Sequence, residues 1–238
     1  MEYHWNWGVL FEPPYFGWLV DGTKWTLLVA ATAWVLALAV GVTIGVARTL
    51  PWRPVRALGA AYVDLFRNVP LLIQLFLWYF VLPEVLPAEM GRFIKRDLPN
   101  PEFWTAAVGL GLFTAARVAE QVRAGIQAVG QGQGMAAAAS GMTLAQSYRH
   151  VLLPLALRQI LPPLTSDFLH VIKNSSLALT IGLLELTGQS RQIESNTFQG
   201  IEALTAATLV YVAITLVVTV AMRAVERRVA IPGQLARA

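Results

Sequence analysis

One mostly apolar segment carries three residues that could bind a charged small molecule. Arg117, Glu120 and Gln121 stand within the stretch from Phe103 to Ala128. On a helix, Arg117 would lie about 21 Å from Phe103, and Glu120 and Gln121 would share its face. An arginine can hold a carboxylate through two parallel hydrogen bonds, which a lysine cannot do. The segment therefore predicts an anion-binding position at Arg117.

Other interpretations of this group stay open. Arg117 and Glu120 are three residues apart, so they could simply neutralise one another. Glu120 could instead orient Arg117, or bind the ammonium group of a ligand. Arg123, about two turns further on, is typical of an arginine that extends to the membrane surface. A functional role for Arg117 is favoured because an unpaired arginine at mid-bilayer costs about 2.5–3.5 kcal/mol on insertion scales.

A second polar group lies in the apolar stretch from Leu155 to Leu184. Four polar residues would fall within about 120° of one another on a helix. They are Asp167, His170, Lys173 and Asn174. Lys173 and Asn174, with Ser175, could complete a hydrated site, although packing against another helix would explain the same pattern.

Pro162 and Pro163 precede this polar group. They predict a bend or an interruption of the helix, and broken helices often line substrate cavities in membranes.

The amino-acid composition indicates the class of protein to which these residues belong. The chain has 238 residues, of which 56% are hydrophobic and 13% charged, against about 25% charged in soluble domains. The absence of cysteine excludes disulfide scaffolds, and with three scattered histidines it also argues against Cys/His metal sites. The net charge of +4 could indicate nucleic acid binding, but basic residues gathered in cytoplasmic loops explain it better.

We expect an all-α membrane protein that forms a single transmembrane domain over residues 1–238. A helix needs about 20 mostly apolar residues to cross a bilayer. The five expected spans cover about residues 25–47, 66–87, 103–128, 155–184 and 203–222. A cleavable signal peptide has a basic N-terminal region followed by a short apolar run. Here the N-terminal region is acidic and the first apolar run begins later and is longer, so a cleavable signal peptide is not expected.

Charge alternates between the loops and predicts the orientation. The lead before the first span carries net −2, with Glu2 among its acids, and the following loop carries net +3. The later outer segments are again acidic, and the tail, with Arg237, carries net +3. Positive loops stay in the cytoplasm, so the N-terminus is expected outside and the C-terminus inside.

The expected cytoplasmic loop, residues 130–154, begins with the glycine-rich run from Gly130 to Gly134. A run of alanines favours a first short helix, and Gly141 suits a left-handed stop. Thr143 and Gln146 have capping-box spacing at the start of a second helix. The loop predicts either a compact cytoplasmic protrusion or two amphipathic helices lying on the bilayer.

This loop resembles the EAA loop of ABC importer membrane subunits. Aligned on Gly141, the leading triplet falls on Met135, Ala136 and Ala137, so methionine replaces the usual acid. The trailing group falls on Val151, Leu152, Leu153 and Pro154. The resemblance implies that these residues contact a separate ATPase subunit.

Three further segments resemble the polar amino acid permeases of that family. They are FRNVPLLIQLF at 66–76, AEQVRAGI at 119–126 and KNSSL at 173–177. The opening WNWG and the closing VERRVAIPG are most similar to its glutamate/aspartate branch. The resemblance implies a MetI-like permease fold in a bacterial inner membrane.

The substrate class follows from Arg117 and the same resemblance. Relatives that carry neutral or basic amino acids typically have tyrosine at this position, so a cation there implies an acidic amino acid. A broader polar set, such as glutamine and asparagine, is the first alternative. An ATP-independent secondary transporter is the second, although such proteins often show repeated halves.

The implied machine has several chains. No G-x-x-x-x-G-K-[ST] loop is present, so ATP and Mg²⁺ are expected in a partner and no cofactor in this chain. The implied partners are a second permease subunit (a similar chain or an identical copy), two ATPase subunits, a periplasmic solute-binding protein and membrane lipid. This chain is expected to be a transport subunit, not an enzyme.

Overall fold

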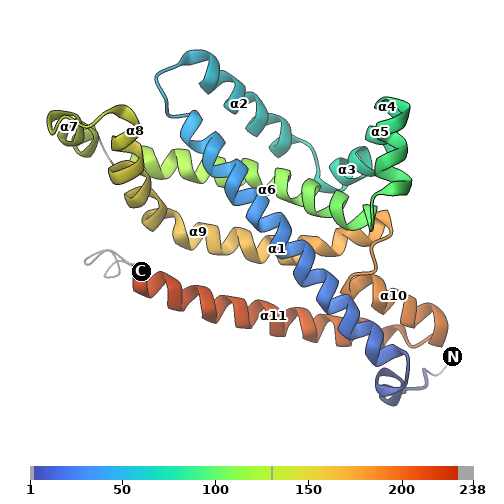
Figure 1. Cartoon of the computed structure of the whole chain (residues 1–238). Coiled ribbons are helices and arrows are strands. Elements are labelled where there is room, and N and C mark those ends of the chain that lie inside the picture. Colours follow the sequence, from blue (N-terminus) through green and yellow to red (C-terminus); the bar gives the residue numbers. More distant parts are fainter. Residues whose placement is uncertain (1–2, 130, 230–238) are drawn as a thin grey trace. The chain divides into compact units, whose positions relative to one another are not determined.

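The computed structural model describes residues 3–129 and 131–229, and the regular elements in these ranges are helical (Figure 1). Glu2, Gly130 and Arg237, on which parts of the charge and loop predictions rest, lie outside the described residues. The chain divides into two compact units. Unit 1 comprises Met1–Trp34, Pro70–Gly111 and Leu169–Val218, and unit 2 comprises Val35–Val69, Leu112–Phe168 and Thr219–Ala238.

The long helices α1, α6, α9 and α11 each contribute to both units. The elements before residue 100 are η1 (Trp7–Phe11), α1 (Tyr15–Ala47), α2 (Arg53–Asn68), α3 (Leu71–Phe76), η2 (Leu77–Val81), α4 (Leu82–Val85), α5 (Ala88–Arg92) and η3 (Phe93–Asp97). Those that follow are α6 (Pro101–Ala128), α7 (Gln131–Ala139), α8 (Leu144–Ser147), η4 (Tyr148–Leu152), α9 (Leu153–Asn174), η5 (Ser175–Ile181), α10 (Leu186–Thr197) and α11 (Gly200–Val229). The η1 and η5 segments are 3₁₀ helices, whereas η2, η3 and η4 are π-helical.

Length and apolarity identify two helices that could cross a membrane, α1 and α11. The pair α2 and α3–α4 qualifies as a third only if it is counted as one span bent by 103°. The bend falls at Val69, which is extended because the residue before Pro70 avoids the helical region. The expected span of about residues 66–87 thus consists of the end of α2, the extended Val69 and the helices α3, η2 and α4, and α1 begins at Tyr15, ten residues before the expected span.

The prolines of α9 do not interrupt it. Pro162 and Pro163 lie inside the continuous helix Leu153–Asn174, and the change of helix type occurs at Ser175. Each proline removes one backbone donor, but neighbouring groups in a membrane protein can satisfy the freed carbonyls. The predicted interruption is displaced to the end of α9.

Within unit 2, the second half of α1 packs closely on α6. A Cβ added at Gly41 would lie 2.6 Å from Val118 Cβ, and one added at Gly45 would lie 2.6 Å from Val122 Cβ. Small residues four apart let two helix backbones approach, as in many membrane helix pairs. The glycines of α1 therefore join it to α6 as one rigid pair.

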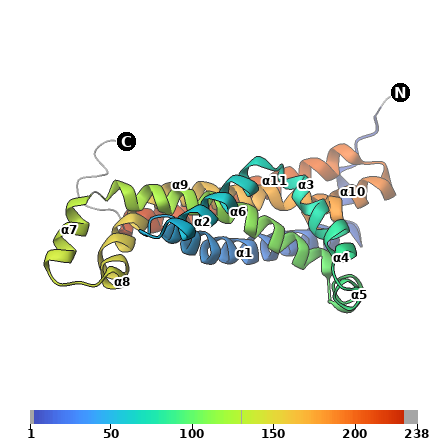
Figure 2. The same cartoon turned by 90° about the horizontal axis from the view of Figure 1, so that it is seen from above.

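The 130–154 segment forms the two short helices that the sequence predicts (Figure 2). Gly141 lies between α7 and α8 with φ +78°, the left-handed conformation expected of it. The backbone N–H of Gln146 donates to Thr143 Oγ1 over 3.3 Å, and Thr143 N–H donates to Gln146 Oε1 over 2.8 Å. The predicted capping box is confirmed. Helical turns then continue without a break from α8 through η4 into α9.

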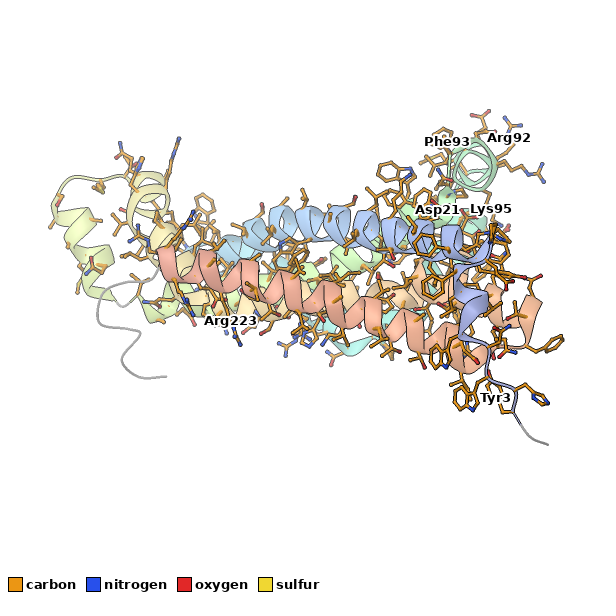
Figure 3. All side chains as sticks on the ribbon, turned by 90° about the horizontal axis from the view of Figure 1, so that it is seen from below. Tyr3, Asp21, Arg92, Phe93, Lys95 and Arg223 are labelled. Atoms are coloured by element: carbon orange, nitrogen blue, oxygen red, sulfur yellow. The ribbon has the colours of Figure 1, made fainter. Side chains whose placement is uncertain are left out.

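In unit 1, α4, α5 and η3 surround a shallow pocket of about 470 Å³. Gly91 makes the close approach possible, since a Cβ there would lie 2.1 Å from the carbonyl oxygen of Pro83. Three basic side chains line the pocket, namely Arg92, Lys95 and Arg96, and Lys95 forms an ion pair with Glu84. Arg92 and Lys95 project from the helical segment (Figure 3).

Candidate functional site

Arg117 is the exposed position of an otherwise buried stretch of α6. Ala115, Ala116, Val118 and Ala119 are each fully buried, whereas 44% of the Arg117 side chain is exposed. The apolar residues hold this part of the helix against its neighbours in unit 2. The guanidinium is thereby placed at a surface of the unit.

A buried carboxylate from α9 holds this guanidinium. Arg117 Nε donates to Asp167 Oδ1 over 2.7 Å, and Asp167 is only 1% exposed. This bond uses the Nε group, so the Nη1 and Nη2 groups remain as a pair of parallel donors for a second acceptor. The arginine is therefore both neutralised and oriented by Asp167, not by Glu120.

Gln121 completes the cluster from the next turn of α6. Its Nε2 donates to Asp167 Oδ2 over 2.5 Å. A carboxylate only accepts, so this bond fixes which end of the amide faces Asp167. The Oε1 atom of Gln121 is buried, and among the residues that the structure describes it has no hydrogen-bond partner. The cluster thus places an unsatisfied acceptor one turn from Arg117.

Glu120 is engaged elsewhere in unit 2. One of its oxygens accepts from Arg48 Nη1 at the end of α1 over 2.5 Å, and the other is paired with Arg123. Arg123 also donates to Gln127 Oε1 over 2.7 Å. The alternative in which Arg117 and Glu120 neutralise one another is not what the structure shows, because Glu120 pairs with Arg48 and Arg123 instead.

The remaining polar candidates belong to unit 1 and lie where α9 becomes η5. Lys173 is exposed and Asn174 is partly buried. Ser175 is fully buried, and its hydroxyl donates to the carbonyl oxygen of Ile172 over 2.7 Å. The Ser175 hydroxyl therefore stabilises the junction of the two helix types.

The expected coupling residues differ in exposure, and the most exposed of them belong to an apolar surface of unit 2. Met135 is 65% exposed and Leu144 is 47% exposed, whereas Ala137 is buried under them. Val151 and Leu153 are partly buried, Pro154 is exposed at the start of α9, and Ala136 and Gly141 are exposed beside Met135. Met142 is also 37% exposed, and flexible methionine side chains suit a contact that must accommodate another protein.

Sequence reasoning missed three charged residues with many contacts. In the sequence, Asp167 is one member of a polar face, and Arg48 is one of the basic residues of the loop that carries net +3. Glu185 is fully buried and caps α10, accepting from Thr187 N–H, Gly188 N–H, Thr26 and Tyr211. Its local signal was weak, because glutamate is not among the preferred N-cap residues.

Helices long and apolar enough to cross a membrane, with a charged cluster beside them, are typical of a helical membrane protein. A family model described as "Binding-protein-dependent transport system inner membrane component" matches residues 37–231. The chain belongs to this family of ABC importer permeases, and it is therefore a transport subunit, not an enzyme.

Relatives of known sequence cover almost the whole chain. The chain is 44% identical to the glutamate/aspartate import permease protein GltJ of Escherichia coli K12, with 99% of each chain covered. It is 34% identical to the probable glutamine ABC transporter permease protein GlnM of Bacillus subtilis, covering 94% of this chain and 97% of that one.

A solved structure shows the same fold. The crystal structure of an amino acid ABC transporter with histidines matches with a TM-score of 0.79 and 29% identity, covering 95% of this chain and all of the other. The MetI-like permease fold implied by the sequence is therefore confirmed.

Proposed function

We propose that this chain is a permease subunit of an ATP-driven importer of glutamate and aspartate. The observation that carries the proposal is the half-exposed Arg117 guanidinium, held by buried Asp167 with its two Nη groups left for an acceptor. Identity of 44% with a glutamate/aspartate import permease supports the same substrate class.

The cluster has complementary groups for both ends of an amino acid. The Nη groups of Arg117 suit a substrate carboxylate, and the buried Oε1 of Gln121 suits an ammonium group. Glu120 is a weaker partner for the ammonium group because both of its oxygens already contact arginines. Lys173, Asn174 and Ser175 belong to unit 1 and are separate candidates for substrate contacts.

The rest of the machine follows from membership in the family. We infer five spans in a bacterial inner membrane, with the N-terminus outside and the α7–α8 segment in the cytoplasm. The exposed apolar surface around Met135 and Leu144 would contact an ATPase subunit that binds ATP and Mg²⁺. A second permease subunit, a second ATPase and a periplasmic solute-binding protein complete the assembly.

Uptake assays with Arg117 variants test the substrate assignment. In proteoliposomes that contain the assembled transporter, Arg117→Ala should weaken apparent affinity for glutamate and aspartate by about 10- to 100-fold, the value of a charge-assisted bond. Arg117→Lys keeps the charge but loses the planar fork, so its apparent affinity should lie between that of the wild type and that of Arg117→Ala. The matched control is Arg158→Ala, an exposed arginine of α9 in the same unit.

Two results would contradict the substrate assignment. Glutamate affinity that is unchanged in correctly assembled Arg117→Ala would show that the guanidinium does not bind the substrate. Preferred uptake of glutamine by the wild type would favour the amide-transporting alternative, which the 34% identical glutamine relative supports. Uptake by this chain alone, without ATP, would favour a secondary transporter.

A further inference from the structure

The segment after the two short helices contacts the end of α1. The hydroxyl of Tyr148, in η4, lies 3.1 Å from the carbonyl oxygen of Thr49 and 3.1 Å from Thr49 Oγ1. Thr49 is the second residue after α1, and Tyr148 follows directly after α8. This hydroxyl therefore connects the base of the α7–α8 segment to the turn between α1 and α2.

The residue next to Thr49 continues the connection into α6. Arg48 Nη1 donates to Glu120 over 2.5 Å, and only 13% of the Arg48 side chain is exposed. The aliphatic part of Arg48 lies against Gly59 of α2, where an added Cβ would meet Arg48 Cγ at 2.6 Å. Arg48 is thus fixed on both sides, by α2 and by the Glu120 carboxylate.

Glu120 stands one helical turn from Arg117 on α6. Gly41 and Gly45 bring the second half of α1 into close packing with Val118 and Val122 of α6. A displacement that reaches Thr49 is therefore passed to the turn of α6 that carries the candidate substrate residues. All of these contacts lie within unit 2.

We propose that Tyr148, Thr49, Arg48 and Glu120 form a path that transmits movement of the α7–α8 segment to Arg117. Tyr148 and Arg48 are positioning residues in this path and do not touch the substrate. The continuous helix from α8 through η4 to α9, which carries Asp167, moves the other half of the cluster. The path makes Arg117 and Asp167 respond together to the same displacement.

The inference rests on the proposed function and has its own test. In the assembled transporter, Tyr148→Phe removes the hydroxyl and keeps the ring. We expect the ATP hydrolysis stimulated by the binding protein, and the substrate moved per ATP, to fall by about two- to tenfold. Basal ATP hydrolysis and the yield of the complex should not change.

Tyr62→Phe is the matched control. Tyr62 also donates its hydroxyl to a backbone carbonyl of unit 2, the oxygen of Leu112, over 2.7 Å. This hydrogen bond links α2 to α6. Removing the Tyr62 hydroxyl breaks a hydrogen bond comparable to the one that Tyr148→Phe breaks. If the role of Tyr148 is purely structural, both variants should therefore behave alike. Equal substrate per ATP in the two variants would overturn the proposal.

A second variant keeps the test decisive if Tyr148→Phe lowers the yield of the complex. Arg48→Gln breaks the contact to Glu120, which keeps its partner Arg123. It should reduce substrate per ATP as Tyr148→Phe does, and the double variant should be little worse than either, because residues of one path are not additive. Additive losses would overturn the path. Absence of ATP-driven uptake by the wild type would instead contradict the proposed function.

Discussion

Asp167 determines how the candidate substrate cluster is arranged. Its two oxygens accept from Arg117 and Gln121, which stand one turn apart on α6. A buried carboxylate that is shared in this way orients both side chains and offsets the charge of the arginine. Asp167 therefore has a structural and an electrostatic role at once.

We predict that Asp167→Asn destabilises the protein by about 1–3 kcal/mol. The amide has one acceptor oxygen for two donors, and its own N–H₂ would face the amide group of Gln121. Thermal unfolding of the solubilised complex measures the effect. Asp64→Asn, an exposed acid of α2 in the same unit, is the control. Equal unfolding temperatures for the two variants would contradict the assigned role.

Sequence alone identifies Arg117 as a candidate site residue but does not identify its partner, Asp167. Arg117 was identifiable because a charge within an apolar segment demands a partner or water. Spacing pointed to Glu120, which is nearest in sequence, but contacts between helices decided the pairing. Arg48 lies 72 residues from Glu120 in sequence, and Asp167 lies 50 residues from Arg117. A pattern within one helix relates residues only a few positions apart, so it cannot predict pairs that are separated by 50 residues or more.

At the scale of elements, α1 owes its contact with α6 to glycine. Gly41 and Gly45 stand four residues apart on one face, where side chains of α6 leave no room for a methyl group. The close approach increases van der Waals contact, which drives helix association in membranes. The rigid pair is also what the proposed transmission path requires.

Gly45→Ala should therefore destabilise the protein by about 1–3 kcal/mol, because the helices must separate to admit the added carbon. Gly17→Ala is the control in the same helix, since a Cβ there meets nothing within 4 Å. That control should be neutral or slightly stabilising, because alanine favours helix. Chemical or thermal unfolding of both variants checks the difference, and similar losses would argue against close packing at Gly45.

At the scale of the whole molecule, charge alternation between the loops predicts one orientation in the membrane. The chain contains no cysteine, so single cysteines can report on each side without background. Phe93→Cys, at a position 53% exposed in η3, should react with a membrane-impermeant maleimide in intact spheroplasts. Ala138→Cys, exposed in α7, should react only after the membrane is permeabilised. The reverse pattern would contradict the proposed topology, and cysteine-free wild type is the control.

Sequence by itself determined the features that depend on composition and on neighbouring residues. These are the helical membrane class, the two short helices, the left-handed Gly141 and the capping box of Thr143 and Gln146. Only the tertiary structure decided the continuity of α9 through its prolines, the bend at Val69, the pairing of Arg117 with Asp167 and the capture of Glu120 by Arg48 and Arg123. The physical reason is that hydrogen bonds within a turn involve residues at most a few positions apart, whereas the partner of a buried charge is set by which helices pack together.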